Sequence, residues 1–185
     1  MTTAFLAVDV QNDFCEGGSL PVDGGGDVAR AISRHLAEAD YDLVVATRDF
    51  HVDPGGHFSD DPDFVDSWPP HCRVDTAGAS FHPGLDVLAL DAIVSKGEHE
   101  AAYSGFEGTT DDGTTLADLL DHHGIDRVVI GGLATDHCVR ATALDAAAHD
   151  LDTTVDLSLA AGVAPDTTAK ALDQLRAAGV TLLHA

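Results

Sequence analysis

The chain contains 185 residues, 44% of them hydrophobic, which suits one globular domain with a substantial core and excludes a disordered protein. Its 32 acidic side chains outnumber the 9 basic ones and give a net charge of −23. A surface with this charge repels nucleic acid and anionic membranes, so neither is expected as a partner. No apolar run approaches the length that a membrane span requires.

The acidic residues are spread along the whole chain instead of forming a tail. This spread favours the hydrated, soluble surface of a halophilic protein over the surface of an acidic interaction protein with a basic partner. Because salt screens the repulsion between like charges, we expect low salt to destabilise the fold.

The cysteines and the N-terminal residues predict a cytoplasmic protein. The three cysteines are odd in number and lack zinc-finger spacing, which argues against a disulfide framework. The first residues have no basic start and reach an acidic side chain at Asp9, so they predict a strand and not a signal peptide.

Short apolar runs alternate with helical patterns along the chain. The runs predict strands at residues 5–10, 43–47, 92–95, 127–130, 153–157 and 180–183, and the patterns predict helices at residues 26–39, 115–123, 136–149 and 166–178. The alternation indicates an α/β fold with a doubly wound, mostly parallel six-stranded sheet and helices on both faces, in one domain over residues 1–185. Ligands of such sheets bind at the carboxyl ends of the strands.

Cys138 occupies a position that is typical of a nucleophile. It follows the strand at residues 127–130 and lies within the first turn of a helix, for which Thr135 offers a side-chain cap. The helix dipole and the free backbone N–H groups favour the thiolate, so we expect a lowered cysteine pKa. The same N–H groups can hold an oxyanion beside the sulfur.

Two further side chains lie at the carboxyl ends of predicted strands. Asp9 ends the first strand, and Lys96, one of only two lysines in the chain, ends the third. Taken singly, a strand-end aspartate is more often a cap and a buried cysteine more often inert. Together with Cys138 they predict a reactive group, because a carboxylate can take the thiol proton and a lysine stabilises the resulting negative charge.

The long segment of residues 51–90 contains a candidate metal site. Asp49 and His51 are two residues apart at a strand end, so both can face one side, and His57 and His71 follow. One carboxylate and up to three imidazoles, completed by water, suit Zn²⁺, Mn²⁺ or Fe²⁺. The alternative is a polar loop whose histidines are merely exposed.

Five motifs span nearly the whole chain and carry a family resemblance. They are Asp-Val-Gln-Asn-Asp-Phe at 9–14, Thr-Arg-Asp-Phe-His at 47–51, Trp-Pro-Pro-His-Cys at 68–72, Lys-Gly at 96–97, and Gly-Leu-Ala-Thr-Asp-His-Cys-Val at 132–139. Together they resemble the nicotinamidase/pyrazinamidase branch of the isochorismatase-like cysteine hydrolases, and so imply the isochorismatase-like, Rossmann-like fold. Phe50 departs from the pattern, since many relatives have tryptophan there.

The resemblance implies a catalytic triad of Asp9, Lys96 and Cys138. It also implies a cis peptide between Leu133 and Ala134, which would aim the N–H groups of Ala134 and Cys138 at the substrate oxygen as an oxyanion hole.

The resemblance also implies two sets of binding residues. The metal ligands would be Asp49, His51 and His71, with His57 as a fourth ligand in some members. The substrate ring would lie among Phe14, Trp68, Tyr103 and His137.

The implied activity is the metal-dependent deamidation of nicotinamide, and of similar amides such as pyrazinamide, through a cysteine thioester in NAD salvage. The implied cofactor is one divalent metal ion, most simply zinc, with iron and manganese left open. The partner is a small-molecule substrate, and a homo-oligomer is left open. The nearest alternative is a related amidohydrolase for a carbamoyl or ureido substrate, although such substrates have no ring nitrogen to anchor. A non-catalytic metal- or ligand-binding protein is a more remote alternative.

Overall fold

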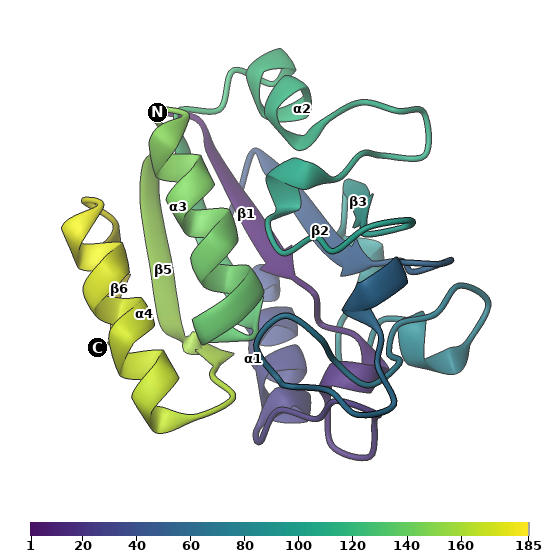
Figure 1. Ribbon diagram of the computed structural model, residues 1–185. Helices are drawn as coiled ribbons and strands as arrows, with labels where there is room; N and C mark the ends of the chain where they lie inside the picture. The colour runs from purple at the N-terminus through teal and green to yellow at the C-terminus, as the bar shows by residue number, and fades with distance from the viewer. Residues whose placement is uncertain (185) are drawn as a thin grey trace.

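The computed structural model describes residues 1–184, and within them six parallel strands form one sheet in the order β3-β2-β1-β4-β5-β6 (Figure 1). The strands are β1 (Thr3–Val8), β2 (Leu43–Asp49), β3 (Ala92–Lys96), β4 (Arg127–Leu133), β5 (Asp152–Ala161) and β6 (Thr181–Leu183). This order is that of a doubly wound sheet: successive strands extend it from β1 toward β3 and then from β4 toward β6, so the direction of winding reverses between β1 and β4. The predicted fold class is confirmed.

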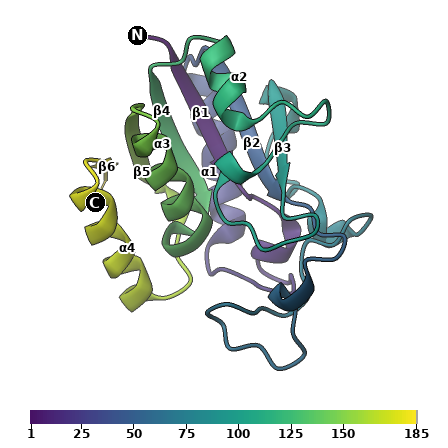
Figure 2. The ribbon, with the colours of Figure 1, turned by 45° about the horizontal axis from the view of Figure 1, so that its top comes forward.

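Helices cover both faces of the sheet (Figure 2). The helices are α1 (Gly25–Glu38), α2 (Leu116–His122), α3 (Arg140–Ala148) and α4 (Pro165–Ala177). Because side chains alternate along a strand, Leu6 of β1 packs into one core with α2, α3 and α4, and Phe5 packs into the other with α1. All four helix predictions are confirmed to within a few residues.

Four strands, β2 to β5, end later than the apolar pattern predicts, and β4 and β5 do so by the most residues. β4 continues through Gly131 and Gly132 to Leu133, and β5 continues to Ala161. The pairing register shifts between Ile130 and Gly132, where Ile130 pairs with Val155 but Gly132 pairs with Ala160. The polar residues of β5 at this irregularity interrupt its apolar run, which is why the sequence predicts an earlier end.

Gly132 allows β4 to pass close beside β1. Its φ is +127°, and a Cβ built on it would lie 2.1 Å from the carbonyl oxygen of Val8. No other residue type fits this position without moving the backbone just before Asp9.

Within residues 1–184, the structure has no helix with the length and apolar character needed to cross a bilayer.

Replacement of Leu6 by alanine tests the assignment of the core. Leu6 is fully buried on the central strand β1, so the Leu6→Ala variant should lose about 2–5 kcal/mol of unfolding free energy. Leu88 is 92% exposed, so Leu88→Ala is the matched control and should change the stability by less than about 0.5 kcal/mol. Denaturant titration measures both, and equal effects would contradict the assignment.

Candidate active site

Three strand ends bring Asp9, Lys96 and Cys138 together, as the sequence predicts. The Lys96 Nζ lies 2.8 Å from Asp9 Oδ2 and 3.8 Å from Cys138 Sγ. It also forms an ion pair with Asp49 Oδ1. All four side chains are buried, so these charges interact with little screening by water.

Thr47 of β2 holds the Asp9 carboxylate from the side opposite Lys96. Its hydroxyl donates to Asp9 Oδ1 at 2.6 Å, and the Asp9 amide donates to the Thr47 carbonyl at 3.1 Å. Asp9 itself has a left-handed backbone, with φ of 50°. Sequence reasoning missed Thr47, and its place at the end of a strand was the one signal that could have indicated it.

Cys138 lies in a π-helical turn, η6 (Thr135–Val139), which connects β4 to α3. The peptide between Leu133 and Ala134 is cis, as the resemblance implies. The prediction of a Thr135 cap was wrong: within the described residues Ala134 is the N-cap, and no side chain caps the turn. The Ala134 carbonyl instead accepts the amides of His137 and Val139, at 3.0 Å and 3.1 Å.

The pKa of the Cys138 thiol is shifted in the direction opposite to the one that the sequence predicts. Burial raises this pKa well above its ordinary value, and the negative charges of Asp9 and Asp49 add to the effect while Lys96 opposes it. The predicted lowering was wrong, because the cost of burying a thiolate beside two carboxylates exceeds the help from the helix end. The thiol therefore requires a base in order to react.

The charges around Cys138 favour the Asp9 carboxylate as the base for the thiol proton. Burial raises the pKa of Asp9, although the Lys96 ammonium partly offsets this shift. Burial would lower the pKa of Lys96, but the carboxylates of Asp49 and Asp9 overcome it and raise the pKa well above its ordinary value. Lys96 is therefore an ammonium group, and Asp9 is a carboxylate with increased proton affinity.

His51, His57 and His71 form a cluster of buried imidazoles beside Asp49. One ring nitrogen from each of the three lies within 4.8 Å of the others. Asp49 Oδ2 is 3.5 Å from Nε2 of His51 and 3.5 Å from Nε2 of His71. The alternative of exposed loop histidines was wrong for these three residues.

The cluster fits a divalent metal ion. His51 Nδ1 donates to the Gly97 carbonyl at 2.5 Å and His71 Nδ1 donates to the Pro69 carbonyl at 2.8 Å, which leaves Nε2 of each ring free as a ligand. Among residues 1–184, the buried atoms His51 Nε2 and His57 Nδ1 have no hydrogen-bond partner. Buried unpaired nitrogens are costly, and a metal ion would satisfy them.

Cys72 does not belong to this cluster, although it adjoins His71. Burial raises the pKa of the Cys72 thiol well above its ordinary value, so it remains protonated and suits a structural role.

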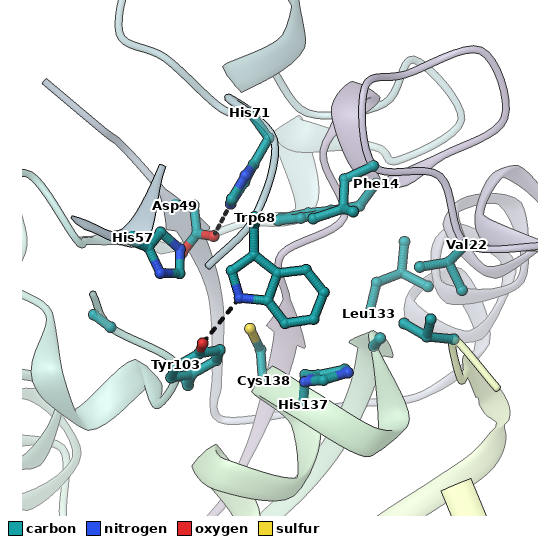
Figure 3. A pocket seen from close by; sticks show the side chains of 14 residues that line it. Phe14, Val22, Asp49, His57, Trp68, His71, Tyr103, Leu133, His137 and Cys138 are labelled. Atoms are coloured by element: carbon teal, nitrogen blue, oxygen red, sulfur yellow. Dashed lines mark hydrogen bonds and ion pairs between the residues drawn. The ribbon is translucent and has the colours of Figure 1, made fainter. Parts of the chain in front are cut away.

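A pocket lies between the imidazoles and the Cys138 thiol (Figure 3). Its lining comprises Phe14, Leu20, Val22, Asp49, His57, Trp68, His71, Ala102, Tyr103, Leu133, Ala134, His137, Cys138 and Val163. Figure 3 shows His57, Asp49 and His71 on one side of Cys138, and Leu133 and Val22 on the other. The pocket therefore has a polar side with a candidate metal site and an apolar side.

Aromatic side chains shape the pocket around Cys138. Trp68 Nε1 donates to the Tyr103 hydroxyl at 3.0 Å, and the Trp68 ring meets the His137 ring edge-on at a centroid distance of 5.1 Å. The Phe14 ring lies 5.4 Å from the His71 ring. All four side chains expected around the substrate ring line this pocket. The apolar side, with Leu20, was not predicted because its residues come from loops and from the end of β4 and share no sequence pattern.

The chain belongs to the isochorismatase family, because the isochorismatase domain model matches residues 3–185. It is 57% identical over 181 residues to the nicotinamidase/pyrazinamidase of Mycobacterium tuberculosis, covering 97% of each chain. It is 34% identical over 198 residues to the nicotinamidase of Escherichia coli, covering 97% of this chain and 93% of that protein.

Solved structures of similar proteins share the fold. The pyrazinamidase of Pyrococcus horikoshii in complex with zinc is 35% identical, with a TM-score of 0.83 over 100% of both chains. PnC1 from L. infantum in complex with nicotinate is 33% identical, with a TM-score of 0.87 over 98% of this chain and 92% of that chain.

Removal of one imidazole should weaken metal binding. We expect the chain loaded with zinc to retain the metal through gel filtration and the His51→Ala variant to lose most of it, because a ligand and its hydrogen-bonded support disappear together. His122→Ala, an exposed histidine at the end of α2, is the control and should retain the wild-type amount. Elemental analysis of the eluted protein measures this, and equal retention by all three proteins would contradict the assigned site.

Proposed function

We propose that this protein hydrolyses nicotinamide to nicotinic acid and ammonia with Cys138 as the nucleophile. The observation that carries the proposal is a buried thiol beside a carboxylate and an ammonium group, in a pocket that three imidazoles flank. The similarity to nicotinamidases and pyrazinamidases supports this substrate class, with pyrazinamide as a second amide. The reaction would serve NAD salvage.

Acylation begins with transfer of the thiol proton to Asp9. The sulfur then attacks the amide carbon, so that a C–S bond forms and the carbonyl oxygen becomes an oxyanion. We assign the oxyanion to the amides of Ala134 and Cys138, and one such donor is worth about 3 kcal/mol. Lys96 lies within 3.8 Å of the sulfur and stabilises the negative charge while Asp9 is protonated.

Release of ammonia and hydrolysis of the thioester use the same carboxyl group. Asp9 returns its proton to the amide nitrogen, the C–N bond breaks, and ammonia leaves. Asp9 then takes a proton from a water molecule whose oxygen attacks the thioester carbon. The C–S bond breaks, Asp9 reprotonates the sulfur, and nicotinic acid leaves.

Asp49, His51, His71 and His57 are the residues that would hold one divalent metal ion. A bound metal would supply a Lewis acid that anchors the pyridine nitrogen of the substrate and thereby orients the carboxamide. We propose zinc, which the pyrazinamidase of P. horikoshii binds, and iron or manganese would be identified by elemental analysis of the purified protein. The aromatic rings of Phe14, Trp68, Tyr103 and His137 would pack against the substrate ring.

Three broader expectations from the sequence are part of this proposal. They are a single domain over residues 1–185, a cytoplasmic location, and an acidic surface adapted to a salt-rich interior. The even spread of the 32 acidic residues supports the last of these.

An amidohydrolase for an acyclic carbamoyl substrate is the second candidate. The imidazole cluster argues against this candidate, because an acyclic substrate has no ring nitrogen that could bind a metal held by His51, His57 and His71.

Substitution of the triad separates catalysis from metal binding. Cys138→Ala should abolish ammonia release because the thioester cannot form, and Asp9→Asn should lower kcat by about 10²–10⁴-fold because amide groups do not accept the thiol proton. Neither side chain belongs to the imidazole cluster, so both variants should keep the wild-type metal content. Substantial turnover by Cys138→Ala would refute the proposed nucleophile.

Ammonia release from nicotinamide at molar salt, with and without prior chelation of metal, tests the function. We expect turnover that chelation removes and that added zinc restores. Absence of turnover by folded, metal-loaded protein would reject nicotinamide as the substrate and favour the acyclic amide.

A further inference from the structure

Asp136 is a buried carboxylate two residues before Cys138 that the mechanism above does not use. Only 1% of the residue is exposed. Its Oδ1 accepts the Val163 amide at 2.9 Å, and its Oδ2 accepts the Ala164 amide at 3.3 Å and the Thr167 hydroxyl. The donors lie 27 or more residues further along the chain, just before α4 (Val163), at its N-cap (Ala164) and in its first turn (Thr167).

These contacts hold the start of α4, which has no side-chain cap in its own sequence. Ala164 occupies the N-cap position, and within the described residues no local side chain caps the helix. The Asp136 carboxylate of η6 instead accepts the amides of Val163 and of the N-cap residue Ala164, together with the hydroxyl of Thr167 in the first turn, and so holds the start of the helix from another element. The N-terminal start of α4 and the turn that carries Cys138 are therefore fixed to each other.

The same contacts join two parts of the pocket wall. Cys138 lies on the η6 side of Asp136, and Val163 lies on the α4 side, with its amide bonded to the carboxylate. Burial would raise the pKa of Asp136, but hydrogen bonds from Thr167 and Val163 outweigh it and lower the pKa. The carboxylate is thus ionised and can accept all three hydrogen bonds at neutral pH.

We propose that Asp136 is a positioning residue, which acts through the start of α4 to hold the Cys138 thiol and amide in register with Asp9 and Lys96. This inference rests on the proposed function, since it concerns the geometry of the same nucleophile. Misplacement of a reacting group by about 1 Å can cost about 100-fold in rate, so a fixed turn has a direct value for catalysis.

Four variants test the proposal. Asp136→Asn keeps the shape but replaces one acceptor by a donor, and Thr167→Val removes a donor from an exposed residue that does not line the pocket. Thr167→Ser keeps the hydroxyl and is the conservative rescue. Asp156→Asn is the matched control, because Asp156 is also buried and accepts Ser158 and His184, but lies outside the pocket lining.

Two readouts distinguish positioning from stability. Asp136→Asn and Thr167→Val should each lower kcat for nicotinamide by about 10- to 100-fold with a smaller change in KM, because most of the proposed ring contacts lie outside η6. Both should also slow alkylation of Cys138 by iodoacetamide, measured by mass spectrometry of the peptide. Thr167→Ser and Asp156→Asn should keep wild-type values, even where Asp156→Asn lowers the melting temperature.

Wild-type kcat and alkylation rates in both Asp136→Asn and Thr167→Val would overturn the proposal. Asp136 would then hold the start of α4 without an effect on Cys138. Equal losses in Asp156→Asn would also overturn it, because general destabilisation would then explain the effect. If the wild-type protein does not hydrolyse nicotinamide, the proposed function fails. The alkylation rates still test the role of Asp136, because they require no substrate.

Discussion

The ammonium group of Lys96, enclosed between two carboxylates, is the interaction on which the site depends. Asp9 and Asp49 both form ion pairs with it, and Cys138 lies at its third side. Burial of a single unpaired charge costs too much free energy for the fold to tolerate. A group of buried charges is tolerated when each charged side chain forms an ion pair or hydrogen bond with another. Lys96 links the Cys138 thiol to the imidazole cluster through Asp49, so the proposed nucleophile and the candidate metal site share one electrostatic network.

Sheet topology explains how residues so distant in the sequence form this network. Strands β1, β3 and β4 end at the same edge of a parallel sheet, and the direction of winding reverses between β1 and β4. Asp9 and Cys138 therefore flank the crevice at which doubly wound sheets bind ligands. The long connection between β2 and β3 then carries His57, Trp68 and His71 to the crevice, where they form one wall of the pocket.

Features that follow from the local sequence, such as strands and their ends, were predictable. Contacts between residues that are far apart in the sequence were not. Apolar runs located every strand, and strand ends located Asp9, Lys96 and Cys138. The pKa of Cys138 was predicted in the wrong direction because the helix position is visible in sequence, whereas full burial beside two carboxylates is not. Thr47 and Asp136 were missed because each is an ordinary polar residue whose partner lies in another element.

The central claim is that the acyl group passes through a thioester on Cys138. The most direct measurement is mass spectrometry of the metal-loaded protein after acid quench during turnover of nicotinamide. The account predicts a transient mass increase of one nicotinoyl group that maps to the peptide containing Cys138 and disappears when substrate is exhausted. Two results would contradict the account. One is turnover with no adduct on the Cys138 peptide, even in a variant with slowed hydrolysis, and the other is an adduct on another residue.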